Sequence, residues 1–418
     1  MFFYGRLIKG MQTKQYTRPV YILFLMLPYG ISLGFATVTL PYILSTKGFS
    51  VETIGGIVSI AVLANVWRFL WGPVADLTLT ARKWYWLALI CCVGTLLSLS
   101  LLPYNKQHVS LLTGIVFMSQ IAATFVMLPI SIFMAVRIEE HNKGRAGGWY
   151  QAGNLGGVGL GGGAGLWLFA HYGIIPAVIV LSILMVLAAL PVLLIKDVER
   201  RSGQTVGQEI KLMGRDLVSM IKKPIVVFVI IMLFMPIGTG AAANLWSAIA
   251  SDWHVGADMV SLVTGALSGI TGALGCVAGG FITDRRGVWL GYLGAGVFCA
   301  VTTALMAALP YSLPVYITGV LVYNFGLGLL NAAFTAVILF AIGKKDASTK
   351  YALLSSIGNL PVSYMTAVDG WAHDKGGSKY MLMIEAVLGI LFVMICIVVL
   401  KWMRSKNWLV RPQYEDVK

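Results

Sequence analysis

The feature that most constrains this chain is a series of uninterrupted apolar stretches, each long enough to cross a lipid bilayer. A spanning helix needs roughly 20 predominantly apolar residues. Only 11% of the 418 residues are charged, whereas soluble domains carry roughly a quarter. The sequence therefore predicts an all-α integral membrane protein with almost no room for a soluble enzyme domain. We place twelve spans, at residues 18–45, 51–73, 84–103, 109–137, 145–171, 173–195, 224–250, 257–282, 288–309, 314–342, 349–373 and 379–402.

The positions of Lys and Arg between these spans predict the orientation of the chain. Positively charged loop residues favour the cytoplasmic side of a membrane. Of the 31 Lys and Arg residues, 26 fall in the two tails and the even-numbered loops, and 4 fall in the alternate loops. We therefore expect a multi-pass protein of the cytoplasmic (inner) membrane with both termini in the cytoplasm. The net charge of +14 does not indicate nucleic-acid binding, because no soluble basic module is present.

Two short sequences recur in corresponding places of the two halves of the chain. Pro-x-Gly at 28–30 recurs at 236–238, and Gly-Asn-Leu at 153–155 recurs at 358–360. Duplicated halves are common in transporters, so we predict two pseudosymmetric six-helix bundles. The predicted units are a cytoplasmic N-terminal tail (1–17), an N-terminal bundle (18–195), a central cytoplasmic loop (196–223), a C-terminal bundle (224–402) and a cytoplasmic tail (403–418).

A glycine pattern inside the fifth span has two interpretations. Residues 157–162 fit G-x-G-x-x-G, but that nucleotide-binding motif requires a strand before it and a soluble domain around it. Gly153, Gly157, Gly161 and Gly165 recur every four residues, which places them on one helix face. Small residues on one face allow a neighbouring helix to approach closely, so the pattern predicts helix packing.

Two loops carry a signature-like motif. Residues 280–287 read Gly-Phe-Ile-Thr-Asp-Arg-Arg-Gly, and Gly72 and Asp76 repeat its spacing after the second span, with Leu77 in place of the arginine. Both loops resemble the G-x-x-x-D-R-x-G signature of the major facilitator superfamily, a family of transporters with two six-helix bundles that work by alternating access. The gating residues that the resemblance implies are Gly72, Asp76, Gly280, Asp284 and Arg285.

A finer resemblance involves residues 68–76, Arg-Phe-Leu-Trp-Gly-Pro-Val-Ala-Asp, together with Leu-Pro-Tyr-Gly at 27–30. This combination is similar to the branch that contains the AmpG muropeptide permeases and the acetyl-CoA transporters. The resemblance implies import of a polar or anionic metabolite such as a muropeptide. It also implies that this transport is coupled to protons. Permeases for siderophores, acyl-CoA-like anions or sugars are the alternatives, followed by a non-transporting membrane sensor.

The remaining chemistry of the sequence argues against an enzyme. The five histidines are scattered over separate loops, and the five cysteines lie in apolar stretches without the spacing of a metal site. We therefore expect no catalytic residues, no metal and no cofactor. The expected partners are a small-molecule substrate, the lipid bilayer and protons, and we expect a monomer.

Charged residues inside spans are costly and are functional candidates. Arg68 lies five residues before Pro73, about 8 Å from the cytoplasmic end at roughly 1.5 Å per residue. It either binds a substrate carboxylate or phosphate or pairs with Asp76 in the gate. Asp369 and Glu385 lie toward the outer face, where a carboxyl group in a low dielectric favours its protonated form and can carry a proton. The alternative is a solvated helix end for each.

Neutral polar residues complete the predicted substrate site. Amides donate and accept hydrogen bonds, and aromatic rings cover apolar faces, so the two suit sugars and peptides. Each amide alone has an alternative role as an interhelical hydrogen bond. The predicted substrate-binding residues are Tyr29, Asn65, Arg68, Gln120, Gln151, Asn154, Asn244, Tyr323, Asn324 and Asn359.

Overall fold

The computed structural model describes residues 16–68, 70–71, 78–139, 142–198, 224–342 and 353–406, with four further isolated positions between 207 and 215. Within these ranges the regular structure is helical and no strand occurs. The predicted all-α fold class is therefore confirmed for the described part of the chain.

In the first half, three of the helices continue through short π-helical or 3-10 segments. The elements are α1 (Tyr21–Gly34), η2 (Phe35–Thr39), α2 (Leu40–Thr46), α3 (Val51–Leu63), α5 (Ala81–Leu101), η3 (Lys106–His108), α6 (Val109–Arg137), α7 (Lys143–Val158), η5 (Gly159–Ala164), α8 (Gly165–Tyr172), α9 (Ile174–Ala189) and η6 (Leu190–Leu194).

The second half begins with a short helix and ends with a long, kinked one. The elements are α11 (Pro224–Phe234), η7 (Ala242–Asn244), η8 (Ala250–Trp253), α12 (Ala257–Ser261), η9 (Leu262–Leu267), α13 (Ser268–Arg286), α14 (Val288–Ala308), α15 (Leu313–Ile342) and α17 (Leu360–Ser405). Non-helical backbone at Gly376 and Gly377 divides α17 into two arms, which correspond to the last two predicted spans.

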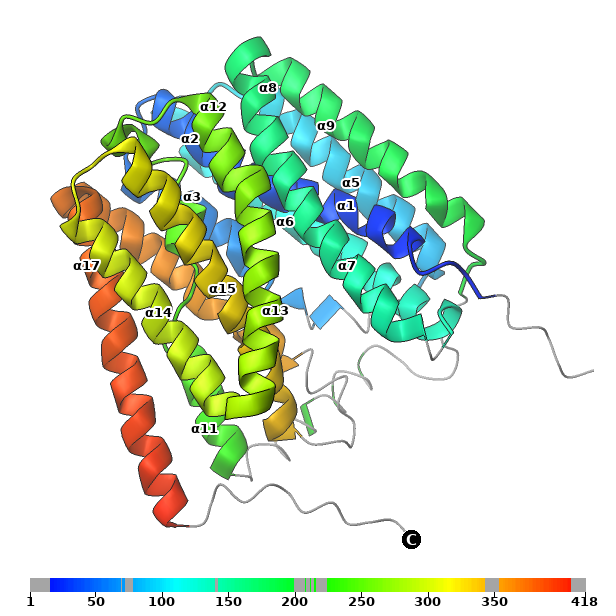
Figure 1. Ribbon diagram of the computed structural model, residues 1–418. Coiled ribbons are helices and arrows are strands. Elements are labelled where there is room, and N and C mark those ends of the chain that lie inside the picture. Colours follow the sequence, from blue (N-terminus) through cyan, green and yellow to red (C-terminus); the bar gives the residue numbers. More distant parts are fainter. Residues whose placement is uncertain are drawn as a thin grey trace, which may run out of the picture.

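Eight helical stretches in the described ranges are long and apolar enough to cross a membrane, and Val51–Leu63 and Pro224–Phe234 are shorter apolar helices. The count of twelve spans therefore stays a prediction. Most helices of the first half lie on the right of Figure 1 and those of the second half on the left, whereas α2 and α3 of the first half reach the left side near α12 and α17. The two sets meet near α2 and α12 and diverge toward the opposite end, where α11 and the end of α17 lie.

The seventh predicted span is wrong as a continuous helix. Helix α11 ends at Phe234, and irregular backbone with short 3-10 turns occupies residues 235–256. Pro236 has no N–H to donate and disfavours helical backbone at the residue before it. Gly238 and Gly240 follow with φ of 55° and 79°, a conformation that other residues rarely adopt. Averaged hydropathy hides this interruption because Pro and Gly stand among apolar neighbours.

The close helix packing predicted for the glycine pattern of the fifth span is confirmed, and the structure identifies the partner helix as α1. A Cβ atom added at Gly153, Gly157 or Gly161 would lie 2.3, 2.6 or 2.0 Å from a backbone carbonyl oxygen of α1. Such distances are well below van der Waals contact, so only glycine permits this helix separation. On α13 the same argument applies to Gly279, where a Cβ would lie 2.6 Å from the backbone of Leu329.

Candidate functional site

Polar contacts join the two halves along α3 and the first arm of α17. The backbone N–H of Val51 donates to Oδ1 of Asp374 at 3.0 Å. Further along α3, the hydroxyl of Ser363 donates to the carbonyl oxygen of Ser59 at 2.8 Å. Since the residue numbers rise on one helix as they fall on the other, the two helices run antiparallel. This line of contacts joins elements from the two predicted bundles.

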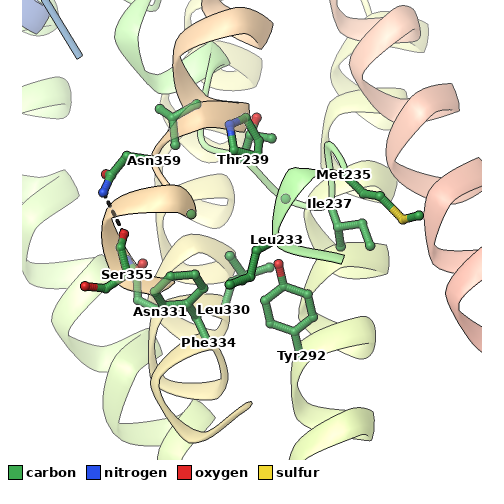
Figure 2. Close-up of a pocket in the computed structure, with 14 residues that line it drawn as sticks. Leu233, Met235, Ile237, Thr239, Tyr292, Leu330, Asn331, Phe334, Ser355 and Asn359 are labelled. Carbon is green, nitrogen blue, oxygen red and sulfur yellow. Dashed lines mark hydrogen bonds between the residues drawn. The ribbon is translucent and has the colours of Figure 1, made fainter. Parts of the chain in front are cut away.

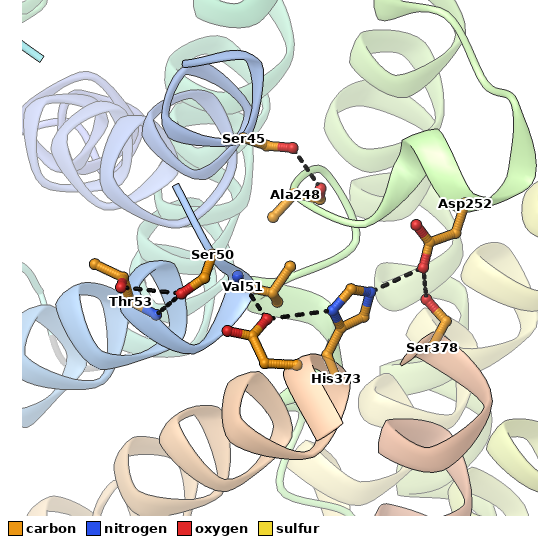
Figure 3. Close-up of polar contacts among 9 residues, drawn as sticks. Ser45, Ser50, Val51, Thr53, Ala248, Asp252, His373 and Ser378 are labelled. Atoms are coloured by element: carbon orange, nitrogen blue, oxygen red, sulfur yellow. Dashed lines mark hydrogen bonds and ion pairs between the residues drawn. The ribbon is translucent and has the colours of Figure 1, made fainter. Parts of the chain in front are cut away.

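One end of this interface carries a polar cluster (Figure 3). Nε2 of His373 lies 2.8 Å from Oδ2 of Asp252, and Ser378 donates to the same oxygen. Nδ1 of His373 lies 3.7 Å from Oδ1 of Asp374, the atom that also accepts from Val51. Burial raises the pKa of Asp252, but its hydrogen bonds to His373 and Ser378 outweigh burial and hold the pKa below its ordinary value. Asp252 therefore remains an acceptor at neutral pH.

Two further hydrogen bonds join the two halves near the same end. The hydroxyl of Ser45 at the end of α2 donates to the carbonyl oxygen of Ala248 at 2.8 Å, and Ser247 donates to the carbonyl oxygen of Val38 at 2.7 Å. Both pairs join the first half to the irregular segment after α11. The irregular segment therefore contributes a backbone carbonyl and a serine hydroxyl to the interface.

A pocket of about 110 Å³ lies in the second half, among α11, α14, α15 and α17 (Figure 2). Its apolar lining includes Leu233 and Phe334. The polar lining residues are Thr239, Tyr292, Asn331, Ser355 and Asn359. Drug-sized ligands occupy pockets of roughly 300–1,000 Å³, so this pocket suits one moiety of a larger substrate.

The pocket contains one residue of the predicted substrate site. Asn359 lines it and donates from Nδ2 to the carbonyl oxygen of Ser355 at 2.9 Å (Figure 2). The predicted set omitted Thr239 and Ser355. Thr239 directly follows the recurring Pro-x-Gly at 236–238, and Ser355 lies one helical turn before Asn359. These two positions in the sequence could have indicated both residues as site candidates.

Arg68 reaches this region from the first half. Its Nη2 lies 3.4 Å from Oγ of Ser355, which lines the pocket, and its Nη1 lies 3.8 Å from Sδ of Met127. Both of these described partners are neutral. Asp76, the acid of the alternative gate pair, lies outside the described residues, as does Gly72.

Two predicted site residues of the first half bond to each other. The hydroxyl of Tyr29 donates to Oδ1 of Asn65 at 3.0 Å, and both side chains are buried. Gln120 is also buried and donates from Nε2 to the carbonyl oxygen of Ser32 at 3.2 Å. These contacts match the alternative role of interhelical hydrogen bonds. Oε1 of Gln120 finds no partner among the described residues.

The remaining predicted amides are dispersed. Asn154 donates from Nδ2 to Oε1 of Gln151 on the same face of α7 at 3.5 Å. Asn244 donates to Oγ1 of Thr366 at 3.0 Å, whereas Asn324 donates to a carbonyl oxygen of its own helix. Among the ten predicted residues, hydrogen bonds join Tyr29 to Asn65 and Asn154 to Gln151, and their use as one substrate site stays a prediction.

Asp369 and Glu385 are both buried, with 0% and 7% of their surface exposed, so the alternative of solvated helix ends is wrong. They lie on opposite arms of α17. The hydroxyl of Tyr323, a predicted site residue, donates to Oε1 of Glu385. Both oxygens of Asp369 and Oε2 of Glu385 find no partner among the described residues.

Such an arrangement has a chemical consequence. An ionised carboxylate in a dry interior costs several kcal/mol unless it is paired. Two neighbouring carboxyl groups also repel each other when both are ionised. Keeping both buried carboxyl groups ionised is therefore unfavourable.

The described copy of the loop motif lies at the end of α13. Asp284 and Arg285 are exposed, and the Arg285 guanidinium stands 3.9 Å from the centroid of the Phe281 ring. Gly280 does not provide close helix packing, because a Cβ there would meet nothing within 4 Å. Its neighbour Gly279 faces α15 instead. The gating role of these residues stays a prediction.

Comparisons with known proteins agree at the level of the fold. The family model described as Major Facilitator Superfamily matches residues 22–366. A crystal structure of a mutant of the nucleoside transporter NupG superimposes with a TM-score of 0.70 at 14% sequence identity. The match covers 91% of this chain and 98% of that one. No curated protein sequence matches the chain.

Proposed function

The chain belongs to the Major Facilitator Superfamily, and on this premise we propose that it is a secondary transporter that moves a polar or anionic metabolite by alternating access. Two six-helix bundles, 18–195 and 224–402, would rock about their interface. The contacts along α3 and α17 and the polar cluster around Asp252 support closure at one end in this conformation. The proposed location is the cytoplasmic membrane, with both termini in the cytoplasm.

The observation that carries the proposal is the buried carboxyl pair of Asp369 and Glu385. Three of its four oxygens have no partner among the described residues, although a buried ionised group requires one. Protonation removes the charge and satisfies this requirement. The pair would therefore take up a proton on one side of the membrane and release it on the other, which couples the proton gradient to transport.

The proposed substrate class is less specific. Arg68 beside a pocket rich in amides and hydroxyls suits a ligand with an anionic group and several polar groups. A muropeptide, as in the AmpG branch, fits this chemistry, and siderophores, acyl-CoA-like anions and sugars remain alternatives. NupG shares the fold at 14% sequence identity. Similarity at this level does not indicate that nucleosides are the substrate of this chain.

A flux experiment with a matched control tests this function. Purified protein in liposomes should accumulate one compound from a panel of muropeptides, acyl-CoAs, siderophores, sugars and nucleosides when the outside is acidic. Glu385→Gln should abolish this accumulation and leave exchange of labelled for unlabelled substrate intact, because exchange needs no net proton movement. Glu52→Gln removes an exposed carboxylate and should have no effect. The absence of flux for the wild-type protein across the panel would favour the membrane sensor.

The orientation is tested separately by labelling. Lys375 lies exposed near the kink of α17, in a loop that the charge bias predicts to be outside. In a chain without its five native cysteines, Lys375→Cys should react with an impermeant maleimide added to intact cells. Arg285→Cys, at the other end of the molecule, should react only after the membrane is permeabilised. The reverse pattern would overturn the proposed topology.

A further inference from the structure

A groove runs between α14 and the second arm of α17, away from the interface of the two halves. It encloses about 340 Å³ and is lined along most of its length by apolar side chains, among them Leu293, Val297, Val393 and Ile397. Val297 is 38% exposed and Ile397 39% exposed. In a membrane-spanning protein such a surface faces the acyl chains of lipids.

One end of the groove is basic. Lys401 and Arg404, one helical turn apart near the end of α17, line it together with Trp289 in the first turn of α14. Both cations are exposed. Neither has an ion-pair partner within the part of the chain that the structure describes. The first turn of α14 also lacks a side-chain cap, and uncapped N–H groups add partial positive charge there.

The dimensions of the groove match a lipid. From Trp289 to Val297 it follows about 12 Å of helix at roughly 1.5 Å per residue, which is long enough for much of an acyl chain. The basic end lies on the side that the charge bias predicts to be cytoplasmic, where anionic lipids create a negative surface. Tryptophan at that level is typical of the membrane interface.

We propose that this groove is a binding site for an anionic phospholipid of the cytoplasmic leaflet. The phosphate contacts Lys401 and Arg404, and one acyl chain lies along the apolar floor between α14 and α17. The two positive charges favour an anionic headgroup over a zwitterionic one. The apolar floor contacts the acyl chain, so a lipid should bind more tightly than free phosphate. This site depends on the proposed orientation in the membrane but not on transport, so a binding assay tests it independently of flux.

The test uses the delipidated full-length protein in detergent. We expect dioleoyl phosphatidylglycerol to raise its thermal unfolding midpoint, with dioleoyl phosphatidylcholine and inorganic phosphate giving no comparable increase. Lys401→Gln/Arg404→Gln should weaken the apparent affinity for phosphatidylglycerol about 30-fold, from about 1 kcal/mol for each basic residue. The matched control Lys375→Gln/Lys379→Gln removes two exposed charges that flank the kink of α17, at the opposite end of its second arm from Lys401, and should bind as the wild type does.

A third variant tests the apolar floor. Gly294 lines the groove, and a Cβ there would meet nothing within 4 Å, so Gly294→Leu fills the groove without removing charge or disturbing the core. It should also weaken phosphatidylglycerol binding. Equal stabilisation by phosphatidylcholine, equal stabilisation by inorganic phosphate, or unchanged phosphatidylglycerol binding in the double variant would each overturn the proposal.

Discussion

Gly157→Ala should prevent α7 from seating on α1 and should leave little folded protein. The new Cβ would lie 2.6 Å from the carbonyl oxygen of Leu27 and 2.7 Å from Cα of Gly30. Both are backbone atoms of α1, so no side-chain rotation relieves the clash. Overpacking typically costs 1–3 kcal/mol and occasionally more. Because the clash involves two helix backbones, we expect the free energy of unfolding to fall by about 3 kcal/mol or more.

The neighbouring glycine provides the control. A Cβ at Gly156 would lie 3.8 Å from Cδ2 of Leu27, which is ordinary contact, so Gly156→Ala should be neutral or slightly stabilising because alanine favours helix. The measurement is the thermal unfolding midpoint and the yield of monodisperse protein in detergent. Equal midpoints for the two variants would contradict the role assigned to the Gly157 face.

Arg68→Ala should nearly abolish transport of the natural substrate, and Arg68→Lys should weaken it. A guanidinium offers a planar fork of donors that matches a carboxylate or phosphate, which a lysine ammonium does not reproduce. A hydrogen bond to a charged group contributes about 1.5–3 kcal/mol, so substrate affinity should fall roughly 10- to 150-fold in the alanine variant. Binding is measured by thermal shift or radioligand titration, separately from flux in liposomes.

Ser355→Ala distinguishes the two roles of Arg68. This substitution keeps the guanidinium and removes the hydroxyl that lies 3.4 Å from it across the two halves. If Arg68 binds substrate, Arg68→Ala should lower the affinity much more than Ser355→Ala does, because the guanidinium and not the neighbouring hydroxyl carries the charge. If Arg68 instead links the halves, both variants should leave affinity unchanged and alter only the turnover rate. Unchanged affinity in Arg68→Ala would remove Arg68 from the binding site.

Several properties of this protein follow from the sequence alone because they depend on local pattern. Apolar stretches of spanning length indicate membrane helices since only helices satisfy their own backbone in lipid. The four-residue spacing of Gly153, Gly157 and Gly161 places them on one face of a helix, and the structure finds that face against α1. The two loop motifs indicated the superfamily that the family model confirms.

Other properties depend on which segments meet, and they became visible only in the tertiary structure. The sequence placed Asp369 and Glu385 near helix ends, where solvation was the alternative. The fold buries both and brings Tyr323 of α15 to Glu385 of α17. Gly279, and not the motif residue Gly280, faces α15, because one position along a helix turns a residue by about 100°. The pocket assembles Thr239 and Ser355 from segments more than a hundred residues apart. Burial and proximity of this kind arise from long-range packing, which local periodicity does not encode.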